Sequence, residues 1–110
     1  MLEKGQIYML QLNNTGSVQT GLRPVVIVQN NIGNEYSPTT IVACMTTKTK
    51  KLHQSTHIIF NGIPKKLRKS VVLCEQLYTV NKSELGEFVG QLNPKEMKLL
   101  NQALKMSLAL

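Results

Sequence analysis

Residues 16–28 read GSVQTGLRPVVIV, a polar segment bounded by two glycines that runs directly into an apolar one. Glycine and small polar residues favour turns, whereas the run from Val25 to Val28 is typical of a strand that is buried on both faces. We therefore expect a loop that delivers Arg23 to a central strand, which Pro24 opens at a position where a missing N–H is tolerated. The planar guanidinium of Arg23 is suited to bind a phosphate, although a turn cap or a surface ion pair would explain this residue equally well.

The rest of the chain predicts a mainly β fold, a compact antiparallel sheet with a C-terminal helix packed on it. Alternating or continuous apolar residues indicate five or so strands, at residues 5–12, 24–28, 39–47, 56–60 and 70–79, and residues 30–38 have turn chemistry. A short helix at 81–86 and a C-terminal helix are each expected to begin with an Asn cap that a Glu follows three residues later. Apolar residues at helical spacing predict that the second helix packs on the sheet.

Length and composition bound the class of protein. With 110 residues the chain is expected to form a single domain, 1–110, and its 42% apolar residues are ordinary for a globular protein. No apolar run approaches the length of a membrane span and the N-terminus lacks a signal-peptide pattern, so a cytoplasmic protein is expected. Cys44 and Cys74 lie in apolar runs, which favours free buried thiols over a disulfide or a metal site.

The charge of the chain is concentrated in one segment. Thirteen Lys and Arg residues stand against six Glu, and the sequence contains no Asp. Within residues 48–69 there is no acidic residue, whereas the basic residues are Lys48, Lys50, Lys51, Lys65, Lys66, Arg68 and Lys69. Such a segregated basic segment indicates nucleic-acid binding, and the alternative is a solvated surface that only keeps the protein soluble.

An enzyme that acts on a phosphodiester needs proton-transfer groups and donors for the charge that develops on phosphorus. Without Asp, a two-metal carboxylate site is improbable, so no metal or other cofactor is expected. The remaining groups are Arg23, Thr46, Thr47, His53, His57 and Glu75. These residues alone leave two interpretations open, a nucleic-acid-binding β domain and a metal-free nuclease.

Several segments, in order along nearly the whole chain, resemble the MazF/PemK toxins of type II toxin–antitoxin systems. They are 5–8, 16–26, 29–34, 37–39, Thr46, 56–57, 70–76 and 103–108, and the motif G-S-x-Q-x-G-x-R-P before an apolar strand is specific. The resemblance implies a small SH3-like antiparallel β-barrel with helices and a homodimer. It also implies metal-independent, sequence-specific cleavage of single-stranded RNA, with a cognate acidic, MazE-like antitoxin as inhibitor.

The resemblance also implies roles for individual residues. The essential arginine and threonine of the family match Arg23 and Thr46, and the RNA-reading loop matches Ser17 and Gln19. Glu75 is retained as a candidate for proton transfer, a role for which the residue chemistry also leaves His57. The other residues expected to bind RNA are Thr47, Lys48, Lys50, Lys51 and Lys66.

The sequence departs from the family pattern at three positions. Val18 replaces the Glu of many relatives, Thr20 replaces Gly or Ala, and Lys69 replaces an acidic residue. These departures leave open a weakened or redirected activity. An alternative is a protein of the same fold that binds nucleic acid without cutting it, or one that poisons DNA gyrase, because fold alone does not decide function. Retention of both Arg23 and Thr46 favours the nuclease.

Overall fold

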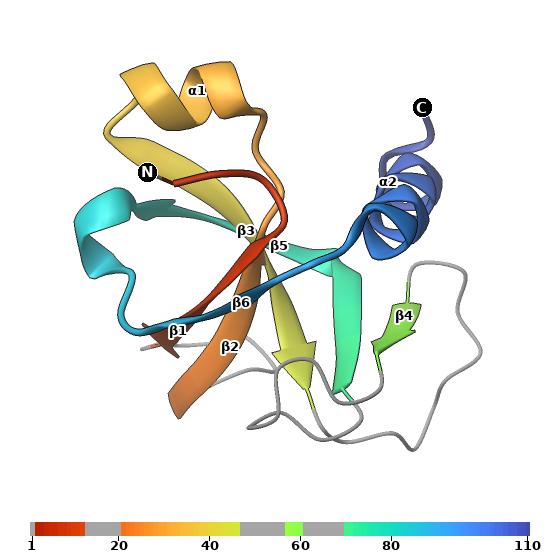
Figure 1. The fold of residues 1–110 in the computed structure, drawn as a ribbon, viewed down its shortest axis with the longest axis horizontal. Helices are drawn as coiled ribbons and strands as arrows, with labels where there is room; N and C mark the ends of the chain where they lie inside the picture. Colours follow the sequence, from red (N-terminus) through yellow and green to blue (C-terminus); the bar gives the residue numbers. More distant parts are fainter. Residues whose placement is uncertain (1, 13–20, 47–56, 61–69) are drawn as a thin grey trace.

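The computed structural model describes residues 2–12, 21–46, 57–60 and 70–110, and for residues 57–60 it describes the course of the backbone alone. Figure 1 shows how the elements are arranged. In chain order they are β1 (Gln6–Leu12), β2 (Gly21–Ile27), α1 (Asn31–Tyr36), β3 (Thr39–Thr46), β4 (His57–Phe60), β5 (Ser70–Asn81), the 3₁₀ turn η1 (Lys82–Glu84), β6 (Phe88–Gln91) and α2 (Pro94–Leu108). The fold is therefore mainly β with a C-terminal helix, as predicted.

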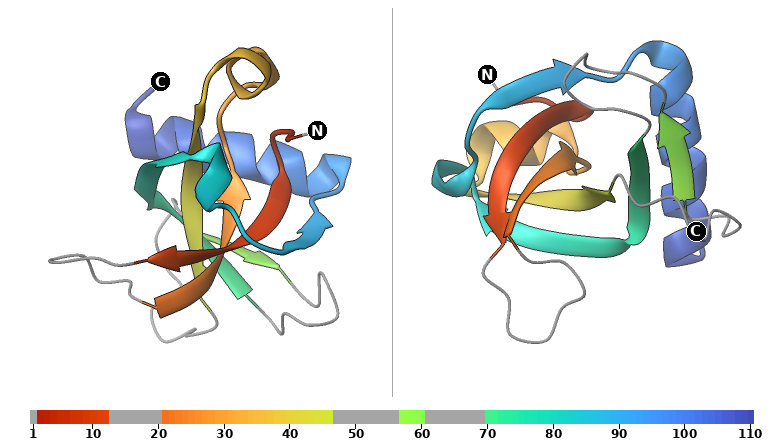
Figure 2. Two further views of the ribbon diagram at one scale, coloured as in Figure 1. Left: turned by 90° about the vertical axis from the view of Figure 1, so that its left-hand side faces the viewer. Right: turned by 90° about the horizontal axis from the view of Figure 1, so that it is seen from below.

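The six strands form one antiparallel sheet in the order β4-β5-β3-β2-β1-β6. The sheet curls strongly, and β5 supplies the sharpest bend (Figure 2). At this bend Cys44 pairs with Leu73 whereas Ala43 pairs with Leu77, so that residues 74–76 are extra in β5. Irregularities of this kind bend a strand and increase its twist. Among the described residues the edge strands β4 and β6 do not pair, so the sheet is open there rather than the closed barrel that was expected.

Two apolar cores lie on the two faces of the central strands, because successive side chains of a strand point to opposite sides. The first core packs beneath α2 and contains Ile7, Val26, Ala43, Met45, Val72, Cys74, Leu92, Leu100 and Ala103. The second contains Leu10, Leu12, Val25, Ile27, Val42 and Cys44. Both cysteines are buried free thiols, as predicted. Strand β2 contributes to both cores, which confirms that it is central and buried.

Three details of the structure differ from the sequence-based expectations. Residues 31–36 form a helix rather than a turn, because Asn30 caps it by accepting a 2.8 Å hydrogen bond from the N–H of Gly33. Strand β6 was not expected, since it has only four residues with a glycine among them. Pro24 lies within β2 rather than opening it. Pairing with β3 begins only at Val25, so at Pro24 the strand pairs with β1 alone.

Both predicted capping boxes are present, but the elements that they begin differ in length. At the start of α2 the N–H of Glu96 donates to the side chain of Asn93, and the N–H of Asn93 donates to Glu96, both at 2.8 Å. The predicted helix at 81–86 is shorter, since only Lys82–Glu84 forms a 3₁₀ turn. No helix among the described residues is long and apolar enough to cross a membrane.

Candidate functional site

The pairing of β2 with β3 brings Arg23 and Thr46 together at one end of the sheet. Val25 pairs with Cys44, and Ile27 pairs with Val42. The paired residues end at Val25 and Cys44, and Arg23 and Thr46 each lie two residues beyond them, at the adjoining ends of β2 and β3. Because residues two apart in a strand share a face, both side chains lie on the face of the second core. The sequence positions are 23 residues apart, and only the antiparallel pairing makes them neighbours.

The ionisation of Cys44 is consistent with this placement of Arg23. Burial of the thiol raises the pKa of Cys44 to about 11, and the positive charge of Arg23 opposes this rise. The effect of Arg23 on Cys44 means that the guanidinium lies within electrostatic reach of that thiol, on the same face of the sheet. Arg23 is half-buried, so part of its surface stays accessible to a ligand.

Thr46 and Ser70 add two hydroxyl groups to the same end of the sheet. Thr46 is 8% exposed and pairs with Val71, the residue that follows Ser70. Ser70 opens β5 and is fully buried. Arg23, Thr46 and Ser70 are each engaged in a polar or electrostatic interaction. Ser70 was not among the residues assigned to the site from the sequence, because a lone serine before an apolar strand carries no specific signal.

The two candidates for proton transfer lie farther along the sheet. Glu75 is exposed at the bend of β5, four residues beyond Val71 along the chain. Burial, together with the neighbouring negative charge of Glu75, raises the pKa of the Cys74 thiol to about 12. His57 begins β4, where its backbone pairs with Leu73. The side chain of His57 is outside the described part of the structure, and Glu75 takes part in an interaction of its own. The roles of both residues in proton transfer stay predictions.

The predicted RNA-binding residues fall outside the described residues. They are Ser17, Gln19, Thr47, Lys48, Lys50, Lys51 and Lys66. The remaining basic residues of 48–69, together with His53, Val18 and Thr20, lie outside them as well. Their roles stay predictions. The structure does describe the strand ends that flank these segments. Strands β1 and β3 end near Arg23 and Thr46, and strands β2 and β5 begin there.

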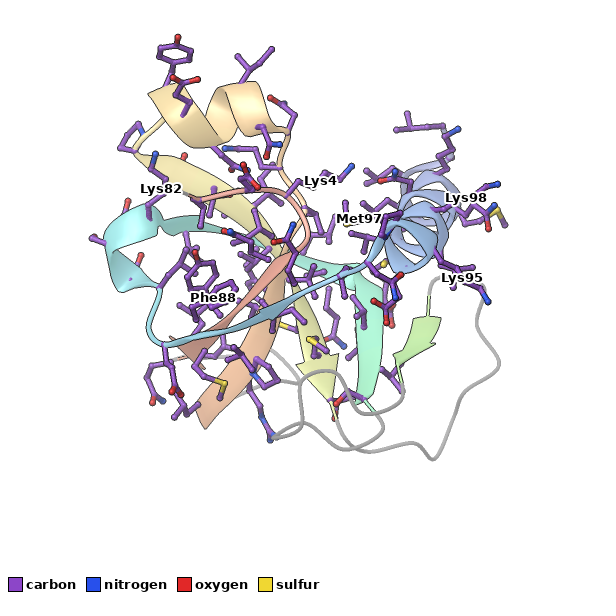
Figure 3. All side chains as sticks on the ribbon, in the orientation of Figure 1. Lys4, Lys82, Phe88, Lys95, Met97 and Lys98 are labelled. Carbon is purple, nitrogen blue, oxygen red and sulfur yellow. The ribbon has the colours of Figure 1, made fainter. Side chains whose placement is uncertain are left out.

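The described groups suit the binding of an oxyanion. A guanidinium and a threonine hydroxyl at the end of a rigid sheet can both donate hydrogen bonds to a phosphate, and the guanidinium also neutralises its charge. In the part of the chain that the structure describes, no three His, Cys, Asp or Glu residues come close enough to hold a metal ion. Independence of metal ions remains a prediction. Figure 3 shows the side chains on the ribbon, with Phe88 at the start of β6 and Lys95 and Lys98 on α2.

Comparison with known proteins gives a consistent result. The family model described as "PemK-like, MazF-like toxin of type II toxin-antitoxin system" matches residues 3–108. An endoribonuclease MazF from Staphylococcus saprophyticus is 44% identical over 112 aligned residues, which cover 100% of this chain and 93% of that protein. Neither comparison points to a non-catalytic protein or to a gyrase poison.

Solved structures agree in fold. An endoribonuclease from a mycobacterial species, solved in complex with its cognate antitoxin, has a TM-score of 0.84 and 27% identity, with 100% of this chain and 97% of that chain covered. A MazF from Deinococcus radiodurans has a TM-score of 0.81 with 99% and 97% covered, and at 15% identity it supports the fold alone.

Proposed function

This chain belongs to the PemK-like, MazF-like toxins of type II toxin–antitoxin systems and is an endoribonuclease, and we propose that it cleaves single-stranded RNA at short specific sequences without a metal ion. The sequence contains no Asp, and among the described residues no carboxylates cluster to hold a metal ion. The nucleophile available without a metal is the 2′-hydroxyl of the RNA itself. It is already adjacent to the phosphorus, which makes its attack intramolecular.

The proposed reaction is a transesterification. The 2′-oxygen forms a bond to phosphorus and loses its proton to a base, while the bond from phosphorus to the 5′-oxygen breaks and that oxygen gains a proton. The products are a 2′,3′-cyclic phosphate and a 5′-hydroxyl. No oxidant, reductant or further reactant is needed.

In this proposal Arg23 and Thr46 stabilise the charge that develops on the phosphoryl oxygens. Arg23 neutralises a non-bridging oxygen and Thr46 donates a hydrogen bond to it. Arg23 is not assigned as the base, because guanidinium does not deprotonate in proteins. Glu75 and His57 are the proposed proton carriers. The observation that supports this assignment most directly is the antiparallel pairing of β2 with β3, whose adjoining ends carry Arg23 and Thr46.

The test is cleavage of a long single-stranded RNA by purified protein. Arg23→Ala and Thr46→Ala should each lose on the order of 10²-fold in rate while RNA binding persists. Lys98→Ala, a change of an exposed cation on α2, is the matched control and should cut at the wild-type rate. EDTA should have no effect, and a 2′-deoxy substitution at the scissile nucleotide should abolish cleavage. Normal cleavage of the deoxy substrate would contradict the 2′-hydroxyl mechanism, and an undiminished Arg23→Ala protein would contradict the site.

The basic segment is proposed to hold the RNA backbone. If Lys50, Lys51 and Lys66 contact phosphates, the logarithm of affinity should fall linearly with the logarithm of salt concentration. Replacing all three by Gln should flatten that slope and leave the cleaved sequence unchanged. An unchanged slope would indicate that these residues only form a solvated surface.

A homodimer is proposed from the exposed side of α2. Helix α2 and the residue at the end of the chain expose large apolar side chains, which are Leu99, Met106, Leu108 and Leu110. Covering them would remove this apolar surface from water. Sedimentation at micromolar concentration should give the dimer mass, and Met106→Glu should shift it toward the monomer. A monomer mass that does not depend on concentration would refute this proposal.

The proposed inhibitor is an acidic antitoxin segment that folds on the RNA-binding surface. A chain with a formal charge of +7 attracts a carboxylate-rich partner. A related mycobacterial endoribonuclease was solved with its cognate antitoxin. Competition titration should show that antitoxin and RNA exclude each other, and simultaneous tight binding would contradict a shared site. The cytoplasm is the proposed location, since it contains both proposed ligands.

A further inference from the structure

An aromatic pair, Tyr8 and Phe88, lies on the outer strands of the sheet and has no place in the proposed mechanism. The rings meet edge to face, with centroids 5.5 Å apart and planes at 70°. Phe88 is 51% exposed, although a phenylalanine on a sheet is usually covered. The hydroxyl of Tyr8 donates a 3.0 Å hydrogen bond to the side chain of Gln6, which holds the tyrosine ring in place. The pair is thus a fixed aromatic surface that is open to solvent on the side of Phe88.

An irregularity in strand pairing determines the direction of Phe88. Ile7 pairs with Gly90, but the next residue, Tyr8, pairs with Phe88, so that Val89 is an extra residue in β6. Val89 packs against the core beneath α2. Without the extra residue, Tyr8 would face Val89 and Phe88 would lie one position away. The bulge therefore turns Phe88 onto the face of Tyr8, and bulges commonly re-aim side chains near functional sites.

The pair shares a sheet face with the proposed catalytic residues. Tyr8 pairs with Val25, and the next pair on the same face is Leu10 with Arg23. Tyr8 is therefore a diagonal neighbour of Arg23 across two adjacent strands, within reach of long and aromatic side chains. Phe88 lies one strand farther out. An RNA strand whose phosphate contacts Arg23 could extend a neighbouring base toward Phe88.

The chemistry of this surface suits a base rather than a phosphate. Strand β6 contains no charged residue, and Glu87 precedes Phe88, so the strand offers no cation to the RNA backbone. Unpaired bases stack on exposed aromatic rings, and this mode of contact tolerates every base. We propose that Phe88, supported by Tyr8, stacks an unpaired base of the RNA that flanks the scissile phosphate. The inference rests on the proposed function, since it needs single-stranded RNA at Arg23.

The chain contains no tryptophan, which allows a direct test. Phe88→Trp keeps an aromatic ring at this position and supplies the single tryptophan of the protein, which can be excited selectively over its three tyrosines. Titration with a single-stranded RNA of mixed sequence, fully 2′-O-methylated to prevent cleavage, should quench its emission. Ile32→Trp is the matched control. Ile32 is exposed on α1, which connects the end of β2 to the start of β3, far from Arg23 and Thr46, so the emission of this variant should not be quenched.

Affinity provides the second measurement. Phe88→Leu should weaken binding of the same RNA by about tenfold, the order expected for the loss of one base–aromatic stack. Phe88→Trp should bind at least as tightly as the wild type, and Ile32→Leu should bind equally. Thermal melting checks that each variant is folded.

The outcomes separate this inference from the proposed function. If Phe88→Trp binds RNA and cuts unmodified RNA but its emission is unchanged, the stacking site is wrong and the nuclease assignment stands. Quenching by an acidic apolar peptide and not by RNA would also overturn it, in favour of a protein partner. If Arg23→Ala cuts at the wild-type rate, it is instead the catalytic assignment that fails.

Discussion

Replacing Asn34 by alanine should destabilise the protein without disturbing the proposed site. Asn34 is 2% exposed and its side chain joins α1 to the start of β3. Its oxygen accepts from the hydroxyl of Thr40 at 2.7 Å and from the amide of Gln29 at 3.2 Å. Its NH₂ group donates to the Gln29 carbonyl at 2.9 Å and, more weakly, to the side chain of Asn31 at 3.4 Å.

The size of the effect follows from the partners that the substitution leaves. Thr40 is fully buried, so its hydroxyl would lose a partner where water does not reach it, at a cost of about 1–3 kcal/mol. Loss of the bond to the Gln29 carbonyl adds about 0.5–1.5 kcal/mol. The side-chain amide of Gln29 keeps its 3.0 Å hydrogen bond to the Thr39 carbonyl, so its lost bond to Asn34 adds little to the loss of stability. The free energy of unfolding should therefore fall by about 2–4 kcal/mol, which lowers Tm by roughly 10–20 °C.

Urea denaturation and thermal melting measure this loss, and a double-mutant cycle tests its cause. Adding Thr40→Val to Asn34→Ala removes the stranded hydroxyl and should recover about 1 kcal/mol or more. Asn101→Ala, at an exposed Asn that accepts from Lys4, is the matched control and should change stability by less than about 0.5 kcal/mol. Below the melting temperature, Asn34→Ala should cut RNA at the wild-type rate, because α1 lies at the far end of β2 and β3 from Arg23. A loss below 1 kcal/mol, or no recovery in the double variant, would refute this reasoning.

Three further predictions concern thiols, a cap and a glycine. Cys44 and Cys74, with pKa values of about 11 and about 12, should resist alkylation at pH 8 until the protein is unfolded. Because both folded pKa values are raised, stability should be independent of these thiols below about pH 9 and should fall as pH rises from 9 toward 12, as urea titrations at each pH would show. Asn93→Ala should cost about 1 kcal/mol of stability by removing the cap of α2, whereas Asn93→Ser should cost less. Gly5→Ala should destabilise measurably in the same assay, because φ is +93° there and an added Cβ would lie 2.3 Å from the Met97 sulfur.

Much of this architecture was predictable from local patterns. The central position of β2 followed from the apolar run Val25–Val28, and the start of α2 followed from Asn93 and Glu96. Free thiols at Cys44 and Cys74 followed from their apolar surroundings. Each of these features depends on a few neighbouring residues, so the sequence carries the signal directly.

Short elements were the ones that sequence patterns missed. The helix at Asn31–Tyr36 depends on the Asn30 cap and on the contacts of Asn34 with Gln29 and Thr40, which look like turn chemistry in the sequence. Strand β6 exists because β1 offers it an edge to pair with. Tertiary pairing outweighs local propensity in such segments.

The sequence by itself determined the fold class, the family and the identity of Arg23 and Thr46 as the residues to examine. Only the tertiary structure decided that they lie at the same end of two adjacent strands, since antiparallel register, not spacing along the chain, makes positions on two strands neighbours. It also decided that Glu75 lies at a bend of β5 and that Phe88 turns onto the face of Tyr8, because extra residues in β5 and β6 shift the pairing. A bulge changes which side chains share a face, and hydrophobic alternation in a single strand does not record it.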